Sequence, residues 1–179
     1  MINYLIAKKL ETFEKTTGES VDCMRDLLRQ SRQGFFLFML FVPLTKYRGA
    51  LSKEDFHVAR ITTMKHEDCG PCLQTTVTLA LLDGVDVGLV QKVIARNIPS
   101  LPLSIQSVIA FTEAVLARTE DLDTRRDEVV LRLGERAPAD LGVAIAAVRV
   151  YPVLKRAMGY AKSCSLIKLS LPVPYPPAD

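Results

Sequence analysis

The chain contains no tryptophan, and aromatic residues make up only 7% of its 179 residues. Proteins that bind single-stranded nucleic acid stack the bases on aromatic side chains, so no such platform is expected here. The formal net charge is +3, and the basic residues are spread along the chain. This charge is too weak to indicate a nucleic acid or an anionic membrane as a partner.

Cysteine is also scarce, and only Cys23, Cys69, Cys72 and Cys164 are present. This is below the density of secreted domains that are held together by disulfides. The first residues do not combine a basic segment with a long apolar run, so we expect no signal peptide. The most apolar run, residues 35–44, is much shorter than the roughly 20 residues that a membrane span needs. We therefore expect a cytoplasmic protein with no membrane partner.

No segment shows the alternation of apolar and polar residues that is typical of strands. Apolar positions instead recur at helical spacing along nearly the whole chain, which predicts an all-α fold. We expect a single domain, residues 1–169, followed by a proline-rich tail, residues 170–179. The predicted helices cover residues 21–33, 35–46, 53–64, 69–82, 87–94, 104–118, 124–133 and 138–158.

The sequence Cys69-Gly70-Pro71-Cys72 is predicted to open one of these helices. The N–H groups and the dipole at a helix N-terminus stabilise a thiolate, which favours Cys69 as the more acidic thiol. Residues three apart share a helix face, so the two sulfurs can form a redox pair. Two alternatives stay open. Zinc usually takes four ligands in two close pairs, and no second pair exists here; buried, unreactive cysteines are the ordinary alternative.

A Cys-x-x-Cys pair that opens a helix in an all-α domain of this size resembles the alkylhydroperoxidase-D-like, or carboxymuconolactone decarboxylase-like, superfamily. The resemblance covers about residues 56–164, with residues 57–84, 107–114 and 140–146 as its main segments. It implies an alkylhydroperoxidase-D-like helical bundle and activity as a thiol-dependent peroxidase or disulfide oxidoreductase. It further implies a hydroperoxide or other small-molecule substrate, a dithiol reductant protein, a homo-oligomer, and no bound organic cofactor. The lack of a second Cys pair separately argues against a metal site.

By position, the resemblance assigns Cys72 as the attacking thiol and Cys69 as the resolving thiol. The redox members of the family also carry a Glu and a His that pass protons to and from the pair. The corresponding positions here are His57 and Thr76. We expect His57 to face the same groove as the pair and to act as the base, with Thr76 holding a water molecule.

His66 and Glu67, just before the pair, are alternative bases. Each candidate also has an ordinary structural interpretation. His57 is then a structural histidine, His66 and Glu67 are solvated residues of a polar turn, and Thr76 bonds the carbonyl four residues back. Cys23 and Cys164 are expected to pack in the core.

Two further functions stay open. One is lactone or decarboxylase-type acid/base chemistry, which needs a proton donor and acceptor but no thiols. The other is a non-catalytic helical interaction module, which the missing Glu and His, the apolar run and the proline-rich tail favour. Residues 35–41 surround one predicted helix with apolar side chains, and a small domain cannot easily bury such a helix alone. This segment independently predicts a subunit interface.

Overall fold

The computed structural model describes residues 2–160 and 167–170 of the chain. Within these ranges the fold is helical and contains no strand, so the all-α prediction is confirmed there. Cys164 and residues 171–179 of the predicted tail lie outside the described residues. The elements, in chain order, are α1 (Ile2–Thr17), α2 (Asp22–Gln30), α3 (Arg32–Phe38), α4 (Phe41–Lys46), α5 (Lys53–His66), α6 (Gly70–Leu82), α7 (Val87–Ile94), the 3₁₀ helix η1 (Ile98–Ser100), α8 (Leu103–Ala117), α9 (Leu122–Leu133) and α10 (Ala137–Ala157).

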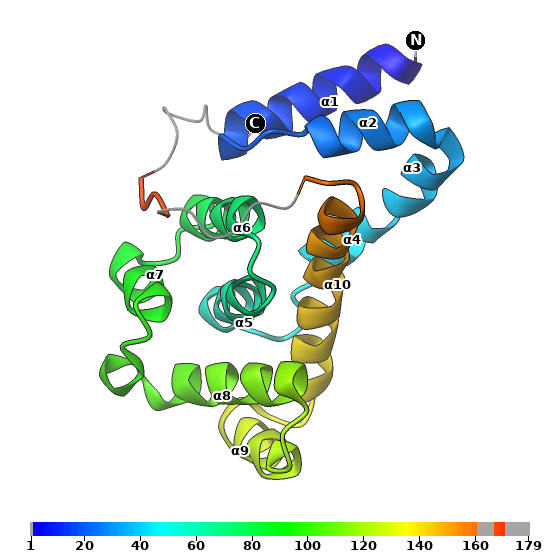
Figure 1. Ribbon diagram of the computed structural model, residues 1–179. Helices are drawn as coiled ribbons and strands as arrows, with labels where there is room; N and C mark the ends of the chain where they lie inside the picture. Colours follow the sequence, from blue (N-terminus) through cyan, green and yellow to red (C-terminus); the bar gives the residue numbers. More distant parts are fainter. Residues whose placement is uncertain (1, 161–166, 171–179) are drawn as a thin grey trace.

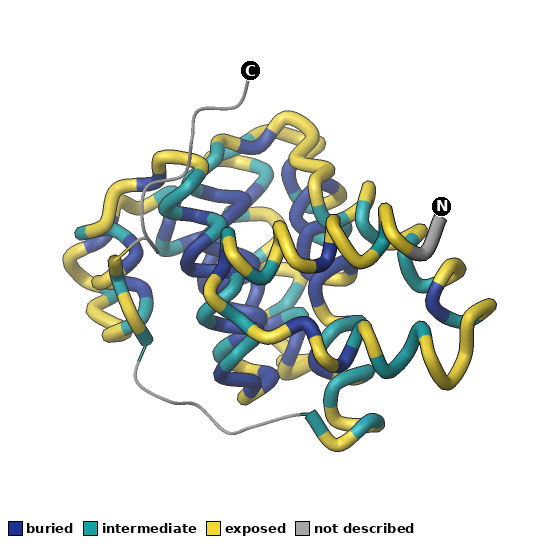
Figure 2. The backbone as a smooth tube through the Cα atoms, turned by 90° about the horizontal axis from the view of Figure 1, so that it is seen from above, coloured by how far each residue is buried: buried dark blue, intermediate teal, exposed yellow. Residues whose placement is uncertain are grey.

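Helix α5 lies at the centre of the fold. The hydroxyl of Ser52 accepts a hydrogen bond from the backbone N–H of Asp55 and caps the helix, as the sequence predicts. Every residue from Asp55 to Met64 is buried, because α5 packs against α6, α7, α8 and α10 (Figure 1). The tube in Figure 2 shows the same concentration of buried residues in the middle of the molecule.

Helices α5 and α6 form an antiparallel hairpin. The ammonium of Lys53, at the start of α5, donates to the carbonyl of Gly84, just beyond the end of α6. The end of α5 is joined to the start of α6 by residues 67–69. The hairpin therefore has two ends, one at Cys69 and Cys72 and the other at Asp83.

The N-terminal part differs from the prediction in two ways. Helix α1 is not predicted by the sequence, because its apolar stripe is weak and Leu10 is its one buried apolar side chain among residues 4–17. The single helix expected over residues 35–46 is divided into α3 and α4. Pro43 explains the division, because its ring excludes the helical position of the carbonyl of Met39 and it has no N–H to donate.

Large apolar side chains are exposed along α3 and α4. Leu40 is 67% exposed and Leu37 is 57% exposed, with Phe36, Phe41 and Leu44 also exposed. The predicted interface segment is therefore largely uncovered in the single chain. Among the described residues, α10 alone passes a test of length and composition for crossing a membrane, and a buried core helix passes the same test.

Asp140 of α10 fixes the segment that leads into α5. Its carboxylate accepts a hydrogen bond from the hydroxyl of Tyr47 at 2.9 Å and another from the backbone N–H of Ala50 at 2.9 Å. Gly49, between them, has φ of +60°, and a Cβ atom added there would lie 2.3 Å from the carboxylate. This close approach requires glycine.

Candidate functional site

The Cys pair lies where the hairpin turns from α5 into α6. Cys69 has an extended backbone, so only its carbonyl joins the helix, by accepting from the N–H of Leu73 at 2.8 Å. Helix α6 begins at Gly70, one residue later than predicted, and Cys72 lies in its first turn. Pro71 occupies the same turn, where a missing N–H leaves no hydrogen bond unmade. Cys69 and Cys72 are free thiols in the structure.

The two thiols differ in charge and in exposure. A hydrogen bond from the Cys72 thiol lowers the pKa of Cys69 to about 6, although burial acts in the opposite direction. The backbone of Cys72 and the charges of Lys155 and Arg156 make smaller contributions to this lowered pKa. The same bond and burial raise the pKa of Cys72. The negative charge therefore rests on Cys69, which is 0% exposed, whereas Cys72 is 7% exposed.

Glu67 is buried and paired. Its Oε1 accepts from Nε of Arg149 at 2.7 Å and its Oε2 accepts from Nη2 of Arg156 at 2.7 Å, which ties the end of α5 to α10. Burial raises the pKa of Glu67, but the hydrogen bonds from Arg156 and Arg149 outweigh burial and leave the pKa below its usual range. Glu67 is thus a structural carboxylate and not a residue of a solvated turn. With both oxygens occupied by arginines, it is a poor base.

Thr76 lies one turn after Cys72. Its hydroxyl donates to the carbonyl of Cys72 at 2.9 Å, and the side chain is buried. This is the ordinary contact of a threonine inside a helix. Because its hydrogen is already donated to its own helix, Thr76 contributes to α6 rather than to a proton relay.

His57 lies at the other end of the hairpin. Its Nε2 is 3.1 Å from Oδ2 of Asp83, just after the end of α6. Asp83 follows Cys72 by eleven residues, which is about 16 Å along the helix. The expectation that His57 faces the same groove as the Cys pair is therefore wrong. The antiparallel course of the hairpin places the first turn of α5 beside the last turn of α6.

His57 and Arg60 form a second polar cluster with Asp83. Burial and then the charge of Arg60 lower the pKa of His57 to about 4, although Asp83 opposes them, so the imidazole is neutral near pH 7. His57 is 3% exposed, and among the described residues its Nδ1 has no hydrogen-bond partner. An uncharged imidazole whose Nε2–H points to Asp83 keeps a free lone pair on Nδ1.

Arg60 is the residue that sequence reasoning missed. It is 7% exposed, its guanidinium lies 4.8 Å from the ring centroid of Phe56, and its Nε has no partner among the described residues. Burial lowers the pKa of this guanidinium to about 10. The sequence does contain a signal for this site, because a charged residue between Ala59 and Ile61 lies in an apolar stretch one turn from His57. A buried guanidinium that bonds no carboxylate in the described ranges favours an anion beside it.

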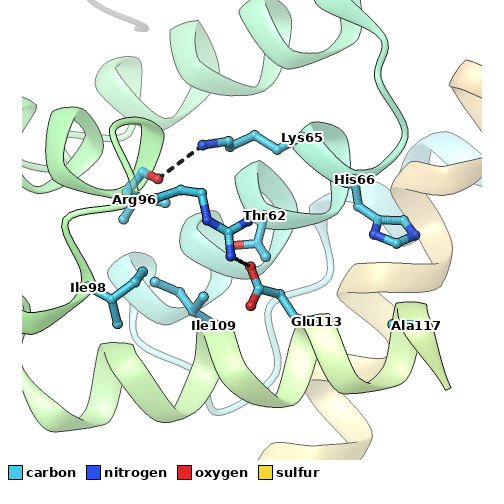
Figure 3. A pocket seen from close by; sticks show the side chains of 9 residues that line it. Thr62, Lys65, His66, Arg96, Ile98, Ile109, Glu113 and Ala117 are labelled. Atoms are coloured by element: carbon cyan, nitrogen blue, oxygen red, sulfur yellow. Dashed lines mark hydrogen bonds and ion pairs between the residues drawn. The ribbon is translucent and has the colours of Figure 1, made fainter. Parts of the chain in front are cut away.

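His66 lies apart from both clusters. It is exposed at the end of α5 and lines a cavity of about 300 Å³, which neither cysteine of the pair lines (Figure 3). Cys23 of α2 is buried, as expected, with its sulfur 3.9 Å from that of Met158. The described residues contain no group of three or more His, Cys, Asp or Glu side chains placed to hold a metal ion.

Comparisons with known proteins do not identify the chain. No protein-family model matches it, and neither the curated proteins nor the solved structures give a match. The resemblance to the alkylhydroperoxidase-D-like superfamily therefore stays a prediction. A function has to be inferred from the chemistry of the two clusters.

Proposed function

We propose that the protein is a thiol-dependent peroxidase or disulfide oxidoreductase that uses Cys69 and Cys72 as its redox pair. The observation that supports this proposal is the placement of two free thiols three residues apart at the start of α6, where the hydrogen bond from Cys72 lowers the pKa of Cys69 to about 6. A pair with such a pKa carries a thiolate at neutral pH, and the thiolate is the form that reacts. Buried cysteines without a reactive role have no need of this arrangement.

In the proposed reaction, Cys72 first passes its proton to the Cys69 thiolate, a step that the raised pKa of Cys72 makes uphill, and the thiolate then lies on Cys72, the more exposed sulfur. Cys72 attacks the distal oxygen of a hydroperoxide; an S–O bond forms, the O–O bond breaks, and the alkoxide takes a proton from water. Cys69 then attacks the sulfenic sulfur, which closes a disulfide and releases water. A dithiol protein reduces this disulfide by thiol exchange and becomes oxidised itself.

The test is hydroperoxide consumption in the presence of a small dithiol. Cys69→Ser and Cys72→Ser are each expected to lower the rate on the order of 100-fold or more, since each removes half of the pair. Cys23→Ser is the matched control, because it removes a buried thiol outside the pair and is expected to keep the parental rate. Parental rates in both pair variants would contradict the proposal.

A specific observation favours acid/base chemistry as a second candidate. The neutral imidazole of His57 is oriented by Asp83, and its Nδ1 has no partner in the described part of the chain, which is the arrangement of a general base. Arg60 offers a positive charge for a substrate carboxylate. Lactone or decarboxylase-type turnover of a muconolactone-like acid would then survive alkylation of both thiols. It would be lost in His57→Gln, which keeps a polar side chain but cannot exchange protons near pH 7.

We also propose that the protein is a cytoplasmic homo-oligomer. A reducing compartment keeps the pair ready to react, and a second copy covers the exposed apolar side chains of α3 and α4, such as Leu37 and Leu40. Neither a nucleic acid nor a membrane is part of this proposal. Sedimentation of the full chain at micromolar concentration tests the oligomer, and a monomer there contradicts it.

A further inference from the structure

We propose that the cavity between α5, α7, η1 and α8 binds a small organic monocarboxylate. The cavity has a volume of about 300 Å³, which is at the small end of the range for ligand pockets. It shares no lining residue with the Cys pair or with the cluster of His57, Arg60 and Asp83. The proposed ligand site is therefore separate from both candidate catalytic sites.

The first observation is a buried hydroxyl that lacks a partner. Thr62 lines the cavity, is 6% exposed, and its Oγ1 has no hydrogen bond among the described residues. The next residue, Thr63, behaves in the ordinary way and donates to the carbonyl of Ala59 at 2.7 Å. A buried hydroxyl without a partner is destabilising, and a rotation of the Thr62 side chain that turns Oγ1 into the cavity would let a ligand oxygen accept from it.

The second observation is the charge at the cavity. Figure 3 shows Arg96 and Glu113 meeting across it, with Nη2 and Oε1 2.9 Å apart. The Arg96 side chain is 63% exposed, and an exposed ion pair of this kind is weak, so a ligand carboxylate can share the guanidinium with Glu113. The ammonium of Lys65 donates to the carbonyl of Ile94 and places a second positive charge on the wall. Among the described side chains that line the cavity, Lys65 and Arg96 are cationic and Glu113 is anionic, so the lining favours an anionic ligand.

The rest of the cavity wall is apolar and determines which kind of ligand body fits. It is formed by the apolar side chains of Val93, Ile98, Ile109 and Ala117. A short apolar body fits such a wall, whereas the volume is too small for a nucleotide or a lipid. Benzoate has the required combination of one carboxylate and a compact apolar ring, and we take it as the probe.

Calorimetric titration of the full chain with benzoate, benzyl alcohol and benzylamine tests the site. We expect benzoate to bind at one site per chain with a Kd between about 10 µM and about 1 mM, the range for a ligand of this size. Benzyl alcohol and benzylamine are expected to bind at least about tenfold more weakly, since neither carries a negative charge.

Two variants separate the site from non-specific binding. Arg96→Asn is expected to weaken benzoate binding about tenfold, and Asn tolerates the left-handed backbone that residue 96 adopts at φ of 56°. Thr62→Val, which keeps the shape of the side chain, is expected to weaken it about threefold or more. Arg126→Asn, which removes an exposed arginine of α9 paired with Asp123, is the control and should leave binding unchanged.

Melting curves of all variants are recorded alongside to test whether each one is folded. Binding of benzoate that is unchanged in both Arg96→Asn and Thr62→Val would overturn the proposal. Absence of benzoate binding to the parental chain, or preferential binding of benzylamine, would overturn it as well.

Discussion

The Nε2 atom of His57 lies 3.1 Å from Oδ2 of Asp83, at the end of α6 that is opposite to Cys69 and Cys72. The two kinds of chemistry that the chain offers are thus separated along one helix. The thiol pair lies at the start of α6 and the neutral imidazole lies beyond its end. Each can be removed by substitution without touching the other, so their contributions can be measured independently.

The acidity of Cys69 depends on the donor that Cys72 supplies. Cys72→Ala removes this donor, and we expect the pKa of Cys69 to rise from about 6 toward its ordinary value of 9.0. Cys72→Ser keeps a hydroxyl donor at the same place and should keep the pKa low. Ultraviolet absorbance of the thiolate as a function of pH measures both, in a background in which Cys23 and Cys164 are replaced by serine. Equal pKa values in the two variants would exclude the proposed hydrogen bond as the cause.

Burial of neutral His57 predicts a loss of stability in acid. Its pKa is about 4 in the folded protein against 6.5 for an ordinary histidine, so below pH 6.5 the unfolded chain binds a proton that the folded chain does not. The stabilisation is complete above pH 6.5 and is lost as the pH falls toward 4, by about 3 kcal/mol in all. Urea unfolding across this window is expected to show a flatter pH dependence for His57→Gln than for the parent.

The other histidine provides the control for that measurement. His66 is exposed, and His66→Gln is expected to keep the parental pH dependence. Carboxylates that do not contact residue 57 contribute equally to all three proteins and cancel in the comparison. If the free energy of unfolding of His57→Gln depended on pH as steeply as that of the parent, His57 would not be the group that causes the loss of stability in acid.

The unpartnered hydroxyl of Thr62 predicts an unusual effect on stability. Thr62→Val keeps the branched shape and removes a buried donor that bonds nothing described, so we expect the free energy of unfolding to rise by about 1 kcal/mol. Thr112→Val removes a buried hydroxyl that donates to the carbonyl of Val108 at 2.7 Å, and should lower that free energy by about 1 kcal/mol. If both substitutions changed the free energy of unfolding in the same direction, the two hydroxyls would not differ in hydrogen bonding as described.

Gly49 predicts a large loss of stability on substitution. Gly49→Ala combines a left-handed backbone with a Cβ atom 2.3 Å from the carboxylate of Asp140. Gly18→Ala shares the positive φ, at +72°, but its Cβ atom would have no neighbour within 4 Å. We expect Gly49→Ala to be less stable than Gly18→Ala by about 2 kcal/mol in urea unfolding, as the cost of the collision. If both variants lost the same free energy of unfolding, the Asp140 carboxylate would be able to move away from the added Cβ atom without an energetic penalty.

Local signals in the sequence were sufficient for much of the fold. The preferences of single residues predict the helix caps at Ser52 and Asp86 and the breaks around Gly84 and Pro99. The helices predicted beside these positions are present in the structure. Helix α1 could not be predicted in this way, because little of it is buried.

The candidate site was less accessible to prediction. The Cys pair is recognisable because its spacing alone brings two sulfurs together. The partners of His57 and Glu67 depend on how whole helices pack, since Asp83 follows His57 by 26 residues and Arg149 follows Glu67 by 82. Burial of Arg60 likewise depends on α10 and α6 closing over α5, which no local pattern shows.

The central claim is that Cys69 and Cys72 form a reversible redox couple, and a redox titration tests it most directly. The chain is equilibrated with dithiol–disulfide mixtures of graded potential, free thiols are alkylated, and the products are counted by mass spectrometry. We predict a Cys69–Cys72 disulfide that appears and disappears in one two-electron transition, and that is absent in Cys69→Ser but unaffected by Cys23→Ser. Alkylation of both thiols at every potential, with no disulfide between them, would contradict the claim.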